Sequence, residues 1–336
     1  MAKVYYINGR RADSANCDKE QVRVPGLIQP HGALIVIEEP NLRVLRVSAN
    51  TESHFGFRPE ELLDQPLALL LGEAEVDRLC DKFLSKNLDA APHYLPTARI
   101  GGEKNVFELS LHRSSQGLLI LECERNPDGD IPLLNFHSAV NSAIMRMLRA
   151  ESEIEACQAA AAEMRWLTGF DRAMIYRFNE DDSCDVIAES LSGPFESYIG
   201  LHCSASDIRR QARAGAPKSW LRVVVDVNSQ SCPLVPAAAG APLDLSYAVT
   251  RSLTAERLKH LSRLGVTASM FIPVINNDLL WGLIALHHHT GPKYVPHNTR
   301  VACERMARFL STQTALKEHA DADAYPISFE RISTIN

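Results

Sequence analysis

Residues 200–213 are rich in polar side chains and too poor in alternating apolar residues to form a core strand. Ser204 or Ser206 can cap a helix that begins near Asp207. The free backbone N–H groups at such a helix start then lie beside an acid. This pattern is typical of a pocket wall, and an ordinary capped junction between a loop and a helix is the alternative reading.

Cys17 is a candidate nucleophile because of its surroundings. Residues 13–20 are polar, and no apolar neighbour in the sequence can bury the thiol. The chain has eight cysteines, spread singly and without a Cys-x-x-Cys pair. Most of the others are therefore expected to be buried thiols, with neither disulfides nor zinc implied. The exposed Cys17 thiol is available for covalent chemistry.

The run of His287, His288 and His289 raises the question of a metal site. On a strand, alternation places His287 and His289 on one face and His288 on the other. No carboxylate lies nearby at ligand spacing. We therefore expect no metal at this run.

Size and charge restrict the class of protein. The chain has 336 residues, of which 46% are hydrophobic, and this is enough for two globular domains. The net charge is −6 and the basic residues are dispersed, so we expect no nucleic-acid partner. No apolar run is long enough to span a bilayer, and no signal-peptide core is present. We therefore expect no membrane association and a cytoplasmic protein.

The first half of the chain predicts a sheet with helices inserted after its second strand. An apolar run at residues 33–37, followed by a turn and residues 44–47, predicts a hairpin. Two strands, then helices, then three strands are typical of a PAS-type sheet. The expected helices are 58–63 and 73–85, and the later strands are 94–100, 105–112 and 118–124.

The second half begins after a turn-rich boundary at residues 126–130 and predicts a central antiparallel sheet with helices at both ends. Apolar residues recur at helical spacing over 137–168, which predicts one long helix or a closely joined pair. This arrangement fits a GAF domain, so the fold class is α+β. The other expected elements are strands at 172–178, 184–190, 220–227, 268–275 and 279–289, and helices at 253–264 and 297–317.

Four further segments, read in order with residues 200–213, resemble a known family. They are residues 25–32, 242–246, 251–252 and 280–288. From about Cys17 to about Lys317, the chain resembles the chromophore-binding region of a bacteriophytochrome, a bilin-dependent red/far-red light receptor. The resemblance implies an N-terminal extension with the attachment cysteine at 1–25, a PAS domain at 26–128, a GAF domain at 134–320 and a tail at 321–336.

The resemblance also implies a figure-of-eight knot, in which the segment near Ile28 passes through a loop of the GAF domain and brings Cys17 to the pocket. The implied cofactor is biliverdin IXalpha, held by a thioether from Cys17 to a vinyl group. Plant and cyanobacterial phytochromes carry their cysteine beside the pocket histidine. That position reads Ala255-Glu256-Arg257 here, which favours the bacterial pattern.

The resemblance assigns further pocket residues by position. Arg222 and Arg251 match the arginines that hold the B-ring propionate, and a planar guanidinium pairs bidentately with a carboxylate. Each arginine taken alone would be interpreted as a surface residue. The other matches are Thr254, Arg257, His260 and Ser269 at the second propionate, Tyr176 and His287 at the D ring, and Asp207 with the following Ile208 at the pyrrole nitrogens.

Several positions depart from the family pattern. Arg257 stands where the pocket histidine is usual, and it cannot reproduce that histidine's hydrogen bond to the pyrrole–water network. Bilin binding is therefore a firmer expectation than normal photochemistry. The remaining departures are Cys203 for an aromatic beside the D ring, Arg209 for proline, Ala216 for tyrosine, His260 for tyrosine and Phe271 for serine.

Three functions remain open from the sequence. The first is a photosensory module with an atypical pocket that senses light by D-ring isomerisation and is not an enzyme. The second is a PAS–GAF scaffold that dimerises without bilin photochemistry. The third is an enzyme, although no nucleophile–base motif or phosphate loop is present.

The expected partner is a second copy of the chain, docked through the helices at 137–168 and 297–317. The alternative is that the apolar stripes of these helices only cover the domain's own sheet. No output module is visible in the sequence, so we expect a downstream sensory or output domain to be absent from these residues.

Overall fold

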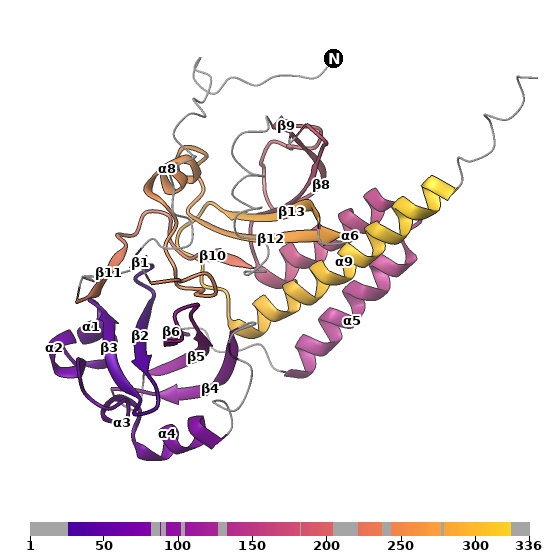
Figure 1. The fold of residues 1–336 in the computed structure, drawn as a ribbon. Coiled ribbons are helices and arrows are strands. Elements are labelled where there is room, and N and C mark those ends of the chain that lie inside the picture. The colour runs from indigo at the N-terminus through magenta and orange to yellow at the C-terminus, as the bar shows by residue number, and fades with distance from the viewer. Residues whose placement is uncertain are drawn as a thin grey trace, which may run out of the picture.

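The computed structural model describes residues 26–81, 88, 92–101, 105–126, 133–181, 183–203, 221–236, 243–276 and 279–323. These residues form two β-sheets with separate sets of helices (Figure 1). The fold class predicted from the sequence is confirmed. Among the described residues, no helix is both long and apolar enough to cross a membrane.

The N-terminal sheet follows the predicted order of two strands, helices and three strands. Its strands β2 and β3 form the expected hairpin, with a bulge between Val36 and Ile37. The helices that follow cover one face of the sheet. The elements are β2 Gly32–Glu38, β3 Arg43–Ser48, α1 Thr51–Phe55, α2 Pro59–Leu62, α3 Ala68–Leu71, α4 Glu73–Leu79, β4 His93–Arg99, β5 Val106–Arg113 and β6 Leu119–Arg125.

Residues 33–37 of strand β2 are all apolar, and both faces of this run are buried. Ala33 and Ile35 pack under the helices with Phe55. Leu34 and Val36 pack on the opposite face against residues from the second half of the chain. This two-sided burial explains why the run lacks the alternation of a half-exposed strand.

The N-terminal sheet contains two strands that the sequence analysis did not predict, so the expected five-stranded sheet has seven strands. They are β1 (Leu27–Ile28) and β11 (Cys232–Val235), and the order is β1-β11-β3-β2-β6-β5-β4. Ile28 pairs with Cys232 and forms an isolated bridge to Arg251. The segment thus lies between two parts of the C-terminal half. The knot itself stays a prediction, since residues 1–25 and 237–242 lie outside the described part.

The C-terminal sheet is antiparallel, with the order β10-β12-β13-β7-β8-β9. The expected strand at 220–227 is shorter in the structure, where β10 covers three residues. The elements are α5 Leu133–Arg149, α6 Glu153–Thr168, β7 Arg172–Phe178, β8 Cys184–Leu191, β9 His202–Cys203, β10 Arg222–Val224, α8 Ala255–Arg263, β12 Ala268–Asn276, β13 Leu279–His288 and α9 His297–Asp323.

Helices α5, α6 and α9 lie together on one face of this sheet (Figure 1). The region 137–168 is a closely joined pair rather than one helix. The N-cap of the second helix is Ser152, whose Oγ accepts a hydrogen bond from Glu155 N at 3.1 Å, and its C-cap is Gly169, where φ is 65°. Ala156, Ala160 and Ala161 let the helix backbone approach the sheet closely, because their side chains are small. The opposite face remains for α8 and the candidate site.

Candidate functional site

The strand residues singled out from the sequence share one face of the C-terminal sheet, opposite α5, α6 and α9. We call it the α8 face and define it by Tyr176, Ser269, Phe271 and His287. Strand alternation sets this arrangement: Ala268 and Met270 pack under the helices, so Ser269 and Phe271 point the other way. Leu261 of α8 packs against Val224 and Phe271 at one end of this face.

Arg222 and Arg251 are neighbours at the edge of the α8 face. Arg222 begins β10, opposite Phe271, and its Nη2 donates to the carbonyl oxygens of Arg251 at 3.2 Å and Ser252 at 3.4 Å. Loss of solvent and the positive charge of Arg251 lower the pKa of Arg222 well below its ordinary value. Arg251 is itself buried. Two partly desolvated cations side by side favour the binding of an anion, because a guanidinium pairs strongly with a carboxylate.

Helix α8 places two further basic side chains beside this pair. Thr254 is the N-cap, and its Oγ1 accepts a hydrogen bond from Arg257 N at 3.4 Å. The Arg257 guanidinium carbon lies 5.2 Å from the centre of the Phe271 ring. His260 follows in the last turn of the helix. The structure therefore brings Thr254, Arg257 and His260 to the same end of the α8 face.

His287 and Ser269 are cross-strand neighbours on the α8 face and are both buried. Burial, followed by the charges of nearby basic groups, lowers the pKa of His287 to about 3, so its ring is neutral. The ring centre lies 6.2 Å from that of Phe271. Ser269 Oγ donates to the Leu286 carbonyl oxygen at 2.9 Å. Its hydroxyl must rotate away from that carbonyl before it can donate to a ligand.

Tyr176 and Cys184 belong to one apolar cluster. Cys203 and Phe271 pack against it. The Tyr176 hydroxyl donates to the sulfur of Met174 at 3.5 Å. Burial raises the pKa of Tyr176, so the phenol stays protonated. The cluster around Tyr176 thus combines apolar side chains with the thiols of Cys184 and Cys203.

Three predicted site residues, Cys17, Asp207 and Ile208, lie outside the described residues, as do Arg209 and Ala216. The roles assigned to them stay predictions. The remaining nine predicted site residues all lie on the C-terminal sheet, on α8 or in the segment that leads to it.

The histidine run differs from the expectation in one respect. The sequence showed no carboxylate near it, but Asp171 Oδ2 lies 3.0 Å from His288 Nδ1. His289 Nδ1 lies 2.9 Å from the Gly265 carbonyl oxygen. Throughout the described ranges, no group of three or more His, Cys, Asp or Glu side chains is placed to hold a metal ion.

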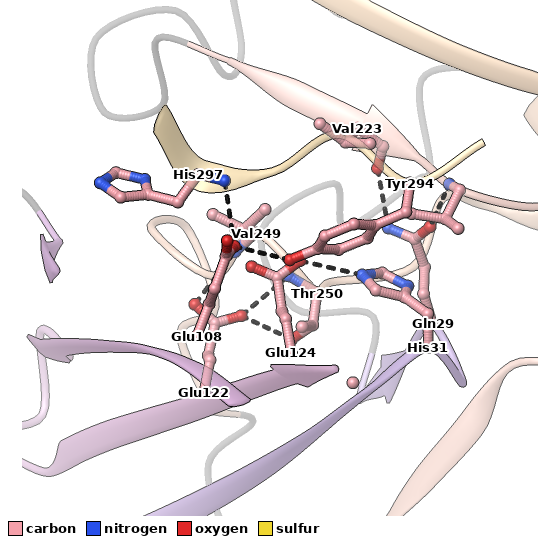
Figure 2. Close-up of polar contacts among 12 residues, drawn as sticks. Gln29, His31, Glu108, Glu122, Glu124, Val223, Val249, Thr250, Tyr294 and His297 are labelled. Atoms are coloured by element: carbon pink, nitrogen blue, oxygen red, sulfur yellow. Dashed lines mark hydrogen bonds and ion pairs between the residues drawn. The ribbon is translucent and has the colours of Figure 1, made fainter. Parts of the chain in front are cut away.

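Gln29 is a supporting residue to which the sequence analysis assigned no role. Its Nε2 donates to the carbonyl oxygens of Val223 at 2.8 Å and Arg251 at 3.4 Å, and its Oε1 accepts from Val225 N at 3.0 Å. Its backbone N–H donates to the Thr250 carbonyl oxygen at 2.7 Å. One buried amide therefore joins the strand of Arg222 to the backbone of Arg251, and Figure 2 shows its contact with Val223 of that strand.

Glu122 of β6 supports the same segment from the N-terminal sheet (Figure 2). Its carboxylate accepts hydrogen bonds from Thr250 N at 2.8 Å, Thr250 Oγ1 at 2.5 Å and Val249 N at 3.1 Å. Burial raises the pKa of Glu122, and these donors act against that rise. The signal in the sequence was an acid inside an apolar strand, but the sequence did not reveal its partners.

A second acid of β6, Glu124, is held in an ion network between the two halves. It accepts from Arg300 Nη2 at 2.6 Å, and its Oε1 lies 3.0 Å from His31 Nε2. Burial, the largest single effect, raises the pKa of Glu124, but the charges and hydrogen bonds of Arg300 and His31 together outweigh it and lower the pKa to about 2. Glu108 accepts from the Tyr294 hydroxyl at 2.7 Å in the same network (Figure 2). The two halves therefore meet through buried, paired charges.

Two family descriptions match the chain. The PAS fold matches residues 17–126, and the GAF domain matches residues 152–315. Cyanobacterial phytochrome B of Nostoc sp. is 39% identical over 93% of this chain and 42% of its own length. The bacteriophytochrome of Xanthomonas campestris is 33% identical over 88% of this chain and 46% of its own length. The chain spans less than half of the length of these curated relatives.

Solved structures agree with these relatives. The chromophore-binding domain of a wild-type phytochrome from Stigmatella aurantiaca has a TM-score of 0.81 and 38% identity, over 88% of this chain and 98% of that one. The chromophore-binding domain of an unusual bacteriophytochrome from R. palustris has a TM-score of 0.82 and 35% identity, over 91% of this chain and 100% of that one. The chain therefore belongs to the bacteriophytochrome family, and its PAS and GAF domains correspond to the chromophore-binding region of that family.

Proposed function

We propose that this chain is the photosensory module of a bacterial phytochrome and that it binds biliverdin IXalpha on the α8 face. The observation that carries the proposal is the apposed pair of Arg222 and Arg251 beside an apolar wall. A bilin has two propionates and an apolar conjugated body, so it fits such a surface. When bound, the bilin supplies the absorption of red light and an isomerising D ring.

The chain's own residues hold and orient this group. Arg222 and Arg251 pair with one propionate, and charge-assisted contacts of this kind contribute about 1.5–3 kcal/mol each. Thr254, Arg257 and His260 receive the second propionate, together with Ser269 once its hydroxyl turns. Tyr176 and His287 contact the D ring, where Cys203 replaces the usual aromatic. Asp207 and Ile208 serve the pyrrole nitrogens.

Attachment through Cys17 completes the proposed site. The sulfur of Cys17 would hold biliverdin through a thioether to a vinyl side chain of the bilin. Because Cys17 is the bacterial attachment position and the alternative position reads Ala255-Glu256-Arg257, the proposal excludes attachment from α8. The module senses and does not catalyse. Its signal would pass to an output domain beyond these residues and to a second copy of the chain.

Light-driven difference spectra test the proposed function. The chain is loaded with biliverdin in the dark and illuminated with red light. We expect a red-absorbing dark form, a weak far-red product and some fluorescence, because Arg257 and Phe271 replace the usual pocket groups. Arg257→His should increase the yield of product. A full and stable far-red peak from the unaltered chain would reject incomplete photoconversion. No spectral change upon addition of biliverdin would favour the dimerising scaffold.

A further inference from the structure

Cys184 and Cys203 lie directly opposite each other in neighbouring strands. Cys184 is the first residue of β8, Cys203 is the last of β9, and the antiparallel register pairs them. Residues opposed in this way have Cα atoms about 4.5–5.5 Å apart, within the span of about 4.4–6.8 Å that a disulfide requires. Both thiols are reduced in this structure. A bond between them needs no rearrangement of the sheet.

The two thiols differ in reactivity. The hydrogen bond from the Cys184 thiol lowers the pKa of Cys203, and the nearby His202 lowers it further, against the opposing effect of burial. The His202 Nδ1 atom lies 2.8 Å from Asp185 Oδ1, which raises the pKa of His202 and keeps it cationic over a wider pH range. The same thiol–thiol hydrogen bond, followed by burial, raises the pKa of Cys184. Cys203 is partly exposed and Cys184 is buried.

Thiol redox sites show the same difference in pKa and exposure between their two thiols. The thiolate is the nucleophile, and redox-sensitive cysteines are partly exposed, low in pKa and adjacent to a second thiol that resolves the first oxidation product. Cys203 has the first two properties, and Cys184 provides the third. Cys80 is also partly exposed, but burial and then the neighbouring acids Asp77 and Asp81 raise its pKa.

We propose that Cys184 and Cys203 form a reversible thiol–disulfide site that reacts with small hydroperoxides such as hydrogen peroxide. The Cys203 thiolate attacks one peroxide oxygen, the O–O bond breaks, and hydroxide leaves, so that Cys203 becomes a sulfenic acid. The sulfur of Cys184 then displaces the sulfenic hydroxyl group. The two thiols lose two electrons and two protons in total, and the peroxide is reduced to two water molecules. A dithiol reductant reverses the bond.

The disulfide would also change the wall beside Tyr176, because both cysteines pack in the Tyr176 cluster. This consequence for a bound bilin rests on the proposed function, whereas the disulfide does not. The test is therefore made on the chain without biliverdin, so that a failure of either proposal can be recognised separately.

Peptide mapping after peroxide treatment tests the proposal. Trypsin leaves both cysteines in one peptide, residues 178–209, because no Lys or Arg lies between Phe178 and Arg209. The reduced chain is treated with hydrogen peroxide, alkylated and digested. We expect this peptide to resist alkylation, to lose the mass of two hydrogens and to recover with dithiothreitol. Its oxidation should be at least ~10-fold faster than that of Cys80, following the difference in thiolate content.

Two single variants assign the roles of the two thiols. In Cys184→Ser, Cys203 should stop at a sulfenic acid that dimedone traps. In Cys203→Ser, Cys184 should remain reduced while Cys80 is unchanged. The proposal is overturned if the unaltered chain oxidises Cys80 first, if either thiol joins Cys17 instead, or if the peptide stays fully alkylated. The unaltered chain decides the matter even if a variant folds poorly.

Discussion

Arg222 and Arg251 are the residues whose loss should weaken biliverdin binding most. Both arginines lie at the edge of the α8 face, and loss of solvent and the charge of Arg251 lower the pKa of Arg222, so a bound carboxylate would stabilise its charged form. Replacing either with Ala should weaken binding by about 10-fold or more, in line with one charge-assisted contact. Absorbance titration with biliverdin measures the dissociation constant.

The matched control for these arginines is Arg99→Ala, at an exposed arginine of β4 in the other sheet. It should bind biliverdin as the unaltered chain does. If the double Arg222→Ala, Arg251→Ala variant kept the affinity and rate of the unaltered chain, neither arginine would hold a propionate.

His112 predicts a pH dependence of stability that is unrelated to bilin. It is fully buried, and among the described residues neither ring nitrogen has a hydrogen-bond partner. Burial lowers its pKa from 6.5 to about 3. The unfolded chain therefore binds one more proton than the folded chain between these values. The stability that comes from a neutral His112 is present above pH 6.5 and is lost as the pH falls toward 3.

Urea unfolding at pH 7 and pH 5 measures this effect. Between these pH values, His112 should account for about 2 kcal/mol of the loss in the free energy of unfolding. Over the same pH change, the free energy of unfolding of His112→Leu should fall by about 2 kcal/mol less than that of the unaltered chain. An equal loss in both proteins would mean that His112 is protonated in the folded chain, against the direction of its pKa shift.

At the scale of the element, β1 and its neighbour Gln29 position the arginine-bearing segments. Gln29 joins β10 to the backbone of Arg251, so its loss should loosen both arginines without removing either charge. We expect Gln29→Leu to weaken biliverdin binding by about 10-fold, while the circular dichroism spectrum stays unchanged. Titration with biliverdin measures the change.

Asn50→Ala is the matched control for Gln29. Asn50 Nδ2 also donates to backbone carbonyl oxygens, those of Pro30 at 3.3 Å and Gly32 at 2.9 Å, but within the N-terminal sheet alone. It should lower stability and leave bilin affinity unchanged. If both variants weakened binding equally, Gln29 would act through general stability and not by positioning the arginines.

The sequence predicted the elements whose patterns are local. Residues 33–37 and the hairpin of β12 and β13 follow from apolar runs and turns, and their spans agree with the structure within a few residues. Strands β1 and β11 have two and four residues, too few for a period, and Pro233 argues against a strand. They form because segments distant in the sequence meet, which no local pattern encodes.

The candidate site shows the same limit. The family resemblance assigned Tyr176 and His287 to the D ring and Ser269 to the second propionate, but it did not predict that the three share one face of a sheet. Glu122 was not singled out from the sequence, because its partners Val249 and Thr250 lie far along the chain. Asp171 likewise reaches His288 from a distant segment. Contacts of this kind depend on tertiary packing and become visible only in the folded chain.

At the scale of the whole molecule, the helices α5, α6 and α9 offer a surface for a second copy. Leu148, Trp166 and Leu316 are 50%, 68% and 58% exposed on these helices, although each is large and apolar. We expect the chain to dimerise through them, because burying such side chains is favourable. Leu148→Glu combined with Trp166→Glu should convert a dimer to a monomer of 37.2 kDa.

Light scattering after size exclusion measures this mass. Leu69→Glu is the control, since Leu69 is also large, apolar and exposed (46%) but lies on α3, beside the N-terminal sheet. That variant should remain dimeric. A monomeric unaltered chain, or a dimer that survives both helix substitutions, would mean that these side chains do not form the interface.

Covalent attachment of biliverdin tests the central claim most directly. The purified chain and its Cys17→Ser variant are mixed with biliverdin in the dark, and absorbance is recorded before and after denaturation. Zinc-induced fluorescence is then read on the denatured bands. We predict a fluorescent band for the unaltered chain, and for Cys17→Ser a bilin that binds in the folded state and is lost upon denaturation. A coloured denatured band in Cys17→Ser, or no band in the unaltered chain, would contradict this claim.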